Sequence, residues 1–407
     1  MTPILAAALL LSPVAAPAAP CTGPVCNFDT LAPYFARLAG TRPARGVPPV
    51  HILQIGDSHT AGDVTTAAWR DLLQSRAGDG GRGVLPPGRP YDGYLTQGIT
   101  AAMSPGWRVA ATFGKGWGYP RPPLGLSSYT LTSTAPGATM ALRSDAGRGF
   151  DRFTVCVVAG PGAGPLEIRM SDGTVQHLML DAPTPTPRCE TIRTLAPQTG
   201  VTLTAPGGPV TIASWAVFSD NGGVALSNLG VIGSQLAHFG RTDDALLAEE
   251  LRAYVPDLIV LAFGTNEGFG PRLDTGAYEA VLRAQIARLR ALAPGVPLLL
   301  LGPPDALSRN PALRGNAPAC RDTGAPALFA PPALAVVRAI QREVATELHI
   351  AWWDWQARMG GVCSAAHWAL TSPPLMRADH VHLRAPGGAI AASLLQGDLD
   401  RAAVGEE

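Results

Sequence analysis

An unbroken apolar run, Leu258–Phe263, constrains most tightly how this chain can fold. A run of this length without a polar face is typical of a strand buried on both sides in a parallel sheet. A helical pattern follows over Asp274–Leu292, with apolar residues recurring on one side, and a second apolar run follows at Val296–Leu301. Strand, helix and strand in this order predict an α/β fold in which helices flank a parallel sheet.

The same alternation recurs at both ends of the 407-residue chain. A strand at His51–Gly56 precedes a helix over Asp63–Gln74, for which Asp63 is the expected N-cap. Towards the C-terminus the pattern predicts a helix, a strand and a helix, at Pro331–Leu348, Ile350–Trp355 and Pro386–Leu395. These elements extend the predicted sheet and its helical cover.

Between Gly98 and Asp220 the pattern changes to short, often alternating strands, which Gly, Pro, Asp and Ser separate. We expect strands at Val109–Phe113, Tyr129–Thr132, Phe153–Val158, Leu166–Met170, Val201–Thr204 and Val210–Trp215. Without a convincing helix, this pattern predicts a β-sandwich. We therefore expect a discontinuous α/β domain, at 20–97 and 221–407, with an inserted all-β domain at 98–220.

The first 19 residues have the pattern of an export signal. The apolar run Ile4–Leu11 precedes a stretch of small residues, which predicts a signal peptide over 1–19. The run is too short to span a membrane, and Pro20 directly before Cys21 argues against a lipid anchor. We expect a periplasmic or secreted protein.

Six cysteines, an even number, fit an exported chain in which disulfides persist. The alternative is a set of separate buried thiols. Pairing by proximity predicts three bonds: Cys21–Cys26, Cys156–Cys189 and Cys320–Cys363.

The composition bears on possible partners. The chain is 46% hydrophobic and 15% charged, which is enough apolar material for a large core. Its formal net charge is zero, so nothing indicates binding to nucleic acid or to an anionic membrane. The composition gives no indication of an oligomeric state.

Ser58 is the first candidate for chemistry. It lies in Gly56-Asp57-Ser58-His59, between a predicted strand and a predicted helix. Ligands bind at this carboxyl edge of a sheet in open α/β folds, and the backbone N–H of such a serine can bind an oxyanion. Taken alone, the motif fits equally a serine that only caps a helix.

Asp379 and His382 are the next candidates. An aspartate three residues before a histidine can share one turn with it, accept its ring N–H and stabilise the imidazolium. His382 could then take the Ser58 proton and return it to a leaving group. The alternatives are a structural histidine or a metal site formed by His380 and His382. No cluster of Cys or carboxylates at ligand spacing accompanies that pair, so we expect no metal.

Two further segments could supply oxyanion donors. Asn266 follows the buried strand in Gly264-Thr265-Asn266, and its amide would lie at the same sheet edge as Ser58. Gly233, in the segment Asn228–Gln235, would allow close backbone approach and offer its N–H. The alternatives are an Asn in an ordinary turn and one of many abundant glycines.

Taken in chain order, these segments resemble the conserved blocks of the SGNH/GDSL hydrolases: Gly56-Asp57-Ser58, Gly233, Gly264-Thr265-Asn266 and Asp379 to His382. The resemblance covers the α/β part of the chain. Within that family, His59 in Ile55–Asp63 and the segment Pro373–His382 look like the peptidoglycan O-acetylesterases of the periplasm. Those enzymes also carry a β-rich, carbohydrate-binding-like module before the Gly block.

The resemblance implies a role for each residue. Ser58 would be the nucleophile, His382 the base and acid, and Asp379 the residue that orients His382; Ser58, Gly233 and Asn266 would form the oxyanion hole. The implied activity is removal of O-acetyl groups from cell-wall glycan without a cofactor. The alternatives are an O-acetyltransferase, an esterase acting on xylan or small esters, and a glycan-binding protein with an inactive hydrolase domain.

Aromatic residues of the predicted insert could stack on sugar rings or fill its core. They are Trp107, Trp117, Tyr119, Tyr129 and Trp215. Because Trp215 ends a strand, we expect it in the core. Trp117 and Tyr119 stand among Gly and Pro, so either role is open for them.

Overall fold

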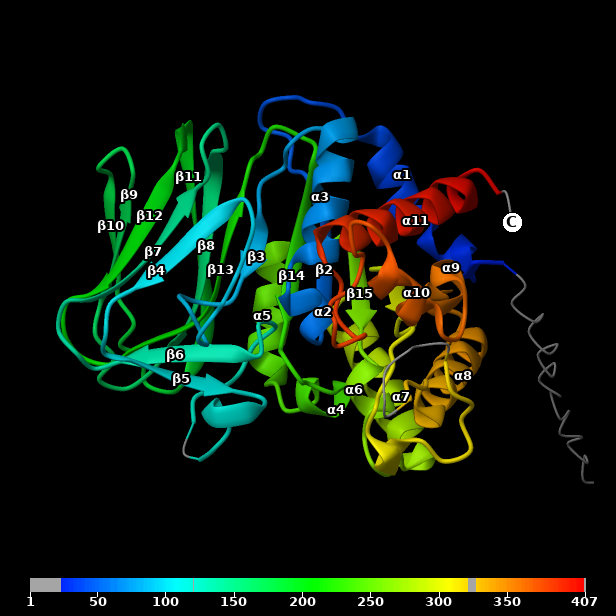
Figure 1. The fold of residues 1–407 in the computed structure, drawn as a ribbon. Coiled ribbons are helices and arrows are strands. Elements are labelled where there is room, and N and C mark those ends of the chain that lie inside the picture. The colour runs from blue at the N-terminus through cyan, green and yellow to red at the C-terminus, as the bar shows by residue number, and fades with distance from the viewer. Residues whose placement is uncertain (1–22, 120, 321–326, 406–407) are drawn as a thin grey trace, which may run out of the picture.

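The computed structural model describes residues 23–119, 121–320 and 327–405, and it is built on a six-stranded central sheet (Figure 1). Neighbouring strands pair in parallel, except that β1 runs antiparallel to β17 at one edge. In spatial order the strands are β1 (Val25–Cys26), β17 (Ala351–Trp353), β16 (Leu298–Leu301), β15 (Leu258–Ala262), β2 (Val50–Gly56) and β14 (Val224–Gly230). The predicted α/β fold is confirmed.

The strand order of this sheet locates a binding crevice. Strand β2 comes first in the chain among the parallel strands, yet it lies between β14 and β15. The order therefore reverses beside β2, and open α/β sheets bind ligands outside the carboxyl ends of the strands at such a reversal. The segments that follow β2, β14 and β15 are the ones that contain Ser58, Gly233 and Asn266.

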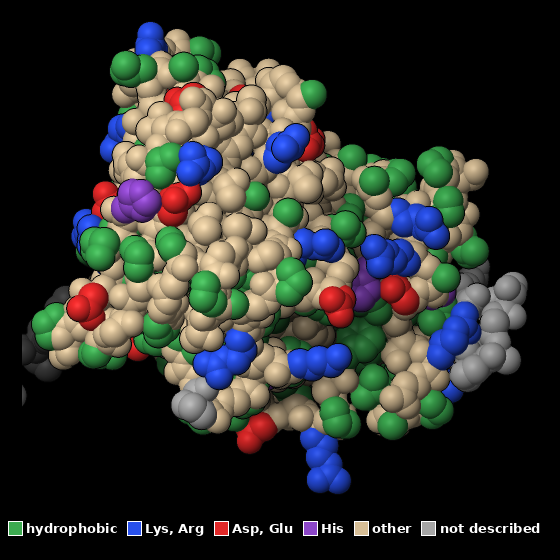
Figure 2. All heavy atoms as spheres, turned by 90° about the vertical axis from the view of Figure 1, so that its left-hand side faces the viewer, with side chains coloured by type: hydrophobic (Ala, Val, Ile, Leu, Met, Phe, Trp, Pro, Cys, Tyr) green, Lys and Arg blue, Asp and Glu red, His purple; other side chains and the backbone are tan. Residues whose placement is uncertain are grey.

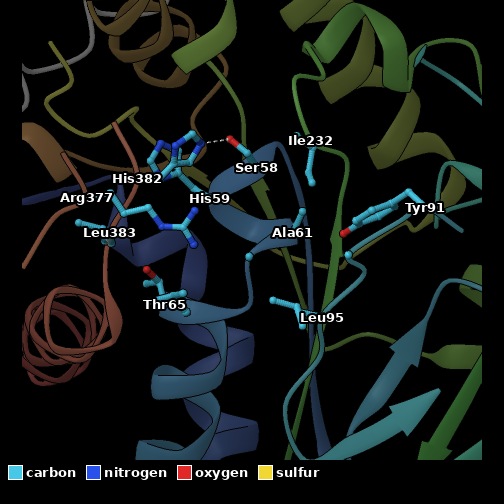
Figure 3. Close-up of a pocket in the computed structure, with 13 residues that line it drawn as sticks. Ser58, His59, Ala61, Thr65, Tyr91, Leu95, Ile232, Arg377, His382 and Leu383 are labelled. Carbon is cyan, nitrogen blue, oxygen red and sulfur yellow. Dashed lines mark hydrogen bonds between the residues drawn. The ribbon is translucent and has the colours of Figure 1, made fainter. Parts of the chain in front are cut away.

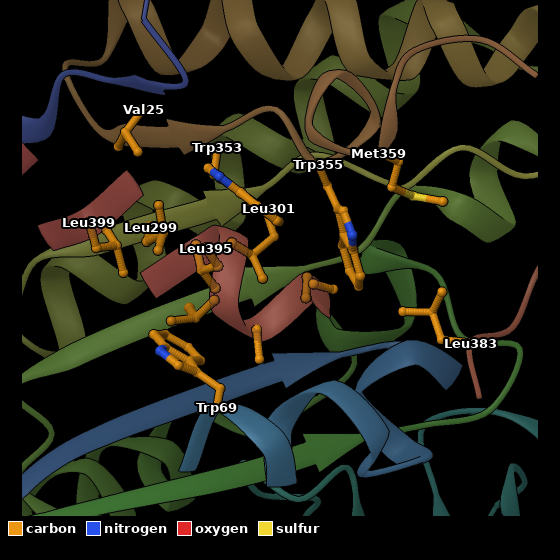
Figure 4. Packing of buried hydrophobic residues seen from close by; sticks show 14 of the residues in the cluster. Val25, Trp69, Leu299, Leu301, Trp353, Trp355, Met359, Leu383, Leu395 and Leu399 are labelled. Atoms are coloured by element: carbon orange, nitrogen blue, oxygen red, sulfur yellow. The ribbon is translucent and has the colours of Figure 1, made fainter. Parts of the chain in front are cut away.

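Helices cover both faces of the sheet and bury an apolar core on each. One face is covered by α1 (Ala32–Gly40), α3 (Val64–Ala77) and α11 (Ala385–Ala403), and the other by α5 (Asp244–Tyr254), α7 (Thr275–Leu292) and α8 (Pro332–Glu347). Figure 4 shows the first core, where Trp69 and Trp353 pack with Leu395. Both indole N–H groups are satisfied there, by Gln396 and Asp398.

The inserted region forms two antiparallel sheets that pack on each other, at the left of Figure 1. One contains β4 (Ile99–Met103), β7 (Ala138–Ser144), β9 (Leu166–Met170), β10 (Val175–Leu178) and β12 (Gly200–Ala205). The other contains β5 (Trp107–Ala111), β6 (Tyr129–Ser133), β8 (Phe150–Ala159), β11 (Thr186–Gln198) and β13 (Val210–Phe218). Trp215 is fully buried between the sheets, as expected.

Strand β3 (Gly83–Leu85) also pairs with β13, although it precedes residue 98. Acidic and basic side chains are interspersed on the face that the insert presents, in keeping with the zero net charge (Figure 2).

Several predicted elements differ from the structure in detail. Strands β4, β7, β10 and β11 were not expected. Strand β17 is shorter than predicted, because Asp354 accepts the N–H of Ala357 and caps a new helix, α9 (Trp355–Met359). The last helix, α11, extends eight residues beyond the predicted end at Leu395, to Ala403.

Asp63 precedes helix α3, but its side chain does not cap the helix as predicted. Its backbone is left-handed, with φ 49°, and its carboxylate instead accepts hydrogen bonds from Thr66, Arg70, Arg82 and the N–H of Gln97. Burial alone would raise the pKa of Asp63, but the two guanidinium groups outweigh it and hold that pKa below its usual value. A buried charge network therefore replaces the expected cap.

Two of the three predicted disulfides are present. Cys156–Cys189 joins paired positions on β8 and β11, and Cys320 is bonded to Cys363. Cys21, the predicted partner of Cys26, and the predicted signal peptide over 1–19 lie outside the described residues. No helix within the described ranges is long and apolar enough to cross a membrane.

Candidate active site

Ser58 begins the short helix α2 (Ser58–Ala61), directly after strand β2. Asp57 caps this helix by accepting the N–H of His59 at 2.9 Å. The turn needs glycine at position 56, since a Cβ there would lie 2.3 Å from Thr60 Oγ1 and 2.5 Å from the carbonyl oxygen of Ala262. This tight packing fixes Ser58 at the carboxyl end of β2.

His382 connects Ser58 to Asp379. Its Nε2 lies 2.9 Å from Ser58 Oγ, and its Nδ1 lies 2.9 Å from Asp379 Oδ2. The other carboxylate oxygen of Asp379 accepts the N–H groups of Val381 and His382. Burial acts to raise the pKa of Asp379, but these hydrogen bonds and His382 prevail and lower it, so the group is a carboxylate. This arrangement can accept a proton from Ser58 and stabilise the resulting imidazolium.

The turn that carries Asp379 and His382 is held by backbone hydrogen bonds. The N–H of Arg377 donates to the His382 carbonyl at 2.8 Å, and the N–H of His380 donates to the Arg377 carbonyl at 3.1 Å. Leu307 N–H donates to the carbonyl of His380 at 3.0 Å, which ties the turn to the loop after β16. These contacts define where His382 stands relative to Ser58.

Gly233 and Asn266 lie on segments that contact each other. Gly233, with φ 75°, is in a turn closed by a hydrogen bond from Ser234 N–H to the Val231 carbonyl. Asn266 is in α6 (Thr265–Gly268), and its Nδ2 donates to the Ser234 carbonyl at 2.9 Å. A primary amide has two N–H groups, so one remains for another acceptor. Among the described residues, nothing accepts the backbone N–H of Gly233.

A cavity of about 250 Å³ opens beside Ser58 and His382 (Figure 3). Arg377, Leu383 and Thr65 lie on the His382 side of it in this view. The other side is formed by three residues that sequence patterns did not indicate: Tyr91, Leu95 and Ile232. Leu95 and Ile232 are 68% and 57% exposed, so this wall is apolar and open to solvent.

His59 lies buried beside this cavity. Its ring centroid is 5.5 Å from that of His382 and 5.6 Å from that of Trp355. Burial, together with the nearby His382, lowers the pKa of His59 to about 3, so its ring is neutral at physiological pH. It therefore adds bulk but no charge beside the candidate triad.

The structure gives no support to the alternative of a metal site at His380 and His382. Both ring nitrogens of His382 already contact Ser58 and Asp379. Within the described ranges, no group of three His, Cys, Asp or Glu side chains could hold a metal ion.

A loop of the inserted region reaches the Gly233 turn. The ring of Phe113 stacks on His238 of α4 (Leu236–Phe239) at 4.3 Å, and a Cβ on Gly233 would lie 3.2 Å from that phenylalanine.

Farther along the loop, Trp117 and Tyr119 are 37% and 79% exposed. The guanidinium of Arg121 lies over both rings, at 4.0 and 4.1 Å, and that of Arg241 lies over Trp117 at 4.3 Å. Sequence patterns indicated neither Phe113 nor the two arginines.

Comparison with known families places this site in context. Residues 198–390 match the model of the GDSL-like lipase/acylhydrolase family. The matched range contains Gly233, Asn266, Asp379 and His382, and Ser58 lies outside it. No curated protein matches the chain.

Three solved structures resemble this chain to different degrees, and only the first resembles it in overall fold. A peptidoglycan O-acetylesterase is 24% identical, with a TM-score of 0.76, over 94% of this chain and 99% of that one. A putative GDSL-like lipase from Parabacteroides merdae is 17% identical, with a TM-score of 0.31, over 44% and 73%. A family two carbohydrate esterase from Clostridium thermocellum is 10% identical, with a TM-score of 0.30, over 78% and 98%.

The catalytic-type geometry at the sheet edge, the matched family model and the shared fold agree with one another. Residues 198–390 therefore resemble the GDSL-like lipase/acylhydrolase family, and the chain shares its overall fold with a peptidoglycan O-acetylesterase.

Proposed function

We propose that this chain is a serine esterase that removes O-acetyl groups from a cell-wall glycan, and that its substrate is peptidoglycan. The observation that carries the proposal is the pair of 2.9 Å contacts that His382 makes with Ser58 and Asp379. Ser58 and His382 are 324 positions apart in the sequence, and they meet at the sheet edge where open α/β folds bind ligands. An arrangement of this kind activates a serine for acyl transfer.

In the first half of the reaction, Ser58 Oγ attacks the acetyl carbonyl carbon while His382 Nε2 takes the serine proton. The oxygen of the tetrahedral intermediate accepts hydrogen bonds from the backbone N–H groups of Ser58 and Gly233 and from the free N–H of Asn266. The intermediate then collapses, the C–O bond to the sugar breaks, and His382 gives its proton to the leaving sugar oxygen, which becomes a hydroxyl. Ser58 is left as an acetyl ester.

In the second half, water replaces the sugar. His382 takes a proton from the water, whose oxygen attacks the acetyl carbon of the acyl-enzyme. Collapse of this second intermediate releases acetate and returns the proton to Ser58. Every proton and bond is accounted for by the three side chains, the ester and water, so the reaction needs no metal or cofactor.

The glycan substrate is supported by the fold. The structure resembles a peptidoglycan O-acetylesterase over nearly the whole of both chains, insert included. We accordingly propose that 20–97 and 221–407 form the catalytic unit and that the insert, 98–220, helps to hold the polymer. Two disulfides fit a protein that works outside the cytoplasm, in the periplasm or after secretion.

Release of acetate tests the proposal directly. Purified protein would be incubated with O-acetylated peptidoglycan and, in parallel, with acetylated xylan, and free acetate would be measured over time. We expect faster release from peptidoglycan, and none from either polymer with Ser58→Ala. Equal or faster release from xylan would contradict the peptidoglycan assignment. Transfer of acetyl to an added glycan in place of acetate release would indicate a transferase.

A further inference from the structure

Among the described residues that line the cavity beside Ser58, Arg377 is the one cationic side chain of fixed charge. Its backbone is tied to the candidate triad, because its N–H donates to the carbonyl of His382. Figure 3 shows its side chain running alongside His382, with the guanidinium directed into the cavity. The position of this charge relative to Ser58 is therefore set by the same turn that positions His382.

The guanidinium of Arg377 has no acidic partner among the residues that the structure describes. Asp379, two positions away, already accepts hydrogen bonds from His382 and Val381 with both of its oxygens. Within the described part of the chain, the other residues that line the cavity include no Asp or Glu. An arginine that is directed into a cavity and lacks a protein carboxylate is free to bind an anionic ligand there.

The described residues of the cavity wall opposite Arg377 carry no charge and are largely apolar. Leu95 and Ile232 present apolar side chains to the cavity, Tyr91 adds its ring with the hydroxyl directed toward the cavity, and none of the three carries a charge. A ligand between the two walls would meet a cation on one side and apolar groups on the other. A sugar ring that bears a carboxylate offers both kinds of surface, since its C–H face is apolar and its acid group is anionic.

We infer that Arg377 binds a carboxylate of the substrate, so that the preferred substrate is an acetylated sugar carrying a free acid group close to the ester. This inference rests on the esterase function proposed above and specifies its substrate class. The guanidinium fork and a carboxylate can form two parallel hydrogen bonds, which orient the sugar as well as attract it. In peptidoglycan, the lactyl group of a muramic acid residue without a peptide would supply such an acid.

The test compares two forms of one compound: 6-O-acetyl-N-acetylmuramic acid with its lactyl carboxylate free, and the same sugar with that carboxylate as a methylamide. Acetate release would give kcat and KM for each. We expect wild-type kcat/KM to be about tenfold or more higher for the free acid. Arg377→Gln should remove this preference, mainly by raising KM for the acid, and should affect the amide much less than the acid. Arg377→Lys, which keeps the charge but loses the fork, should give an intermediate preference.

Arg342→Gln is the matched control, because Arg342 is an exposed arginine of α8 outside the cavity lining. It removes the same charge from the protein and should leave the preference unchanged. Equal wild-type rates for acid and amide, or equal losses on both in Arg377→Gln with an unchanged melting temperature, would overturn the inference. Hydrolysis of a small neutral acetyl ester distinguishes a failure of the Arg377 role from a failure of the proposed esterase function. If wild-type protein hydrolyses it but shows no preference for the acid, only the role of Arg377 is overturned; if it hydrolyses no acetyl ester, the proposed function fails as well.

Discussion

The α/β region supplies the residues that line the cavity beside Ser58, whereas the inserted β region contacts the neighbouring Gly233 turn. Ser58 and Asn266 come from the short helices α2 and α6 that follow β2 and β15, and His382 comes from the turn before α11. The insert brings the ring of Phe113 against Gly233 and, farther along the same loop, the exposed rings of Trp117 and Tyr119. We therefore propose that the sheet edge carries out ester cleavage, whereas the insert influences which polymer is held there.

The strongest test of that division is Ser58→Ala. Without the hydroxyl no acyl-enzyme can form, so we expect kcat to fall at least about a thousandfold on a small acetyl ester and on glycan alike. Ser58 is a partly buried residue at a helix start, and the loss of its Oγ should leave the melting temperature nearly unchanged. Near-normal turnover by the variant would mean that Ser58, at the edge of the sheet, is not the nucleophile.

A smaller loss on both substrates is expected for Asn266→Ala. Loss of one oxyanion donor typically costs about 100- to 1,000-fold in kcat, with little change in KM. Because Asn266 also donates to the Ser234 carbonyl, part of any loss could arise from a displaced turn. Gln235→Ala is the matched control, since it removes the hydrogen bond from Gln235 to the Asn266 carbonyl but keeps the proposed donor. If the two variants lose kcat equally, turn geometry and not oxyanion binding accounts for the effect.

The sequence indicated the residues of the candidate triad, which the structure brings together, but it indicated few of the residues that line the cavity beside them. Asp379 and His382 share one turn, so their spacing alone indicates the contact, and the Gly-Asp-Ser segment follows a recognisable buried strand. Arg377 and Leu95 gave no such signal, because their place in the cavity depends on contacts between distant segments. In the insert, β11 was missed because most of its residues are at least partly exposed at a sheet edge, which leaves no clear apolar alternation.

The junction between the two regions contains a buried acid that should make stability depend on pH. Glu250 of α5 accepts the N–H of Leu126 at 2.6 Å and the hydroxyl of Ser214, both from the insert. Burial raises the pKa of Glu250 to about 7 from its ordinary 4.5, and the two hydrogen bonds oppose this shift only in part. The favourable contribution of the protonated form is therefore complete below about pH 4.5, declines as the pH rises, and is lost above about pH 7.

Glu250→Gln keeps a neutral group of the same shape and should remove this dependence. We expect the free energy of unfolding of the variant, relative to wild type, to rise by about 1–3 kcal/mol between acidic and mildly alkaline pH. Urea unfolding at both ends of that range measures it. A constant difference between the two proteins would mean that Glu250 does not titrate at the junction, and the two regions would then be joined by packing alone.

The smallest expected effect concerns the exposed end of the insert loop. Trp117 and Tyr119 stand next to Arg121, and Tyr119 is largely exposed, so they offer aromatic surface on which a sugar chain can stack. Replacing both by Ala should lower acetate release from insoluble glycan severalfold, because the polymer is held less well. Turnover of a small acetyl ester should stay nearly constant, since the triad residues lie outside the insert.

Trp107→Ala is the matched control for a structural role, because that partly buried aromatic packs against the insert core and donates to the Thr139 carbonyl. Its loss should lower the melting temperature and both activities together. An unchanged melt with equal loss on both substrates in the double variant would instead place Trp117 and Tyr119 in the wall of the active site, and the division of labour between the two regions would no longer hold.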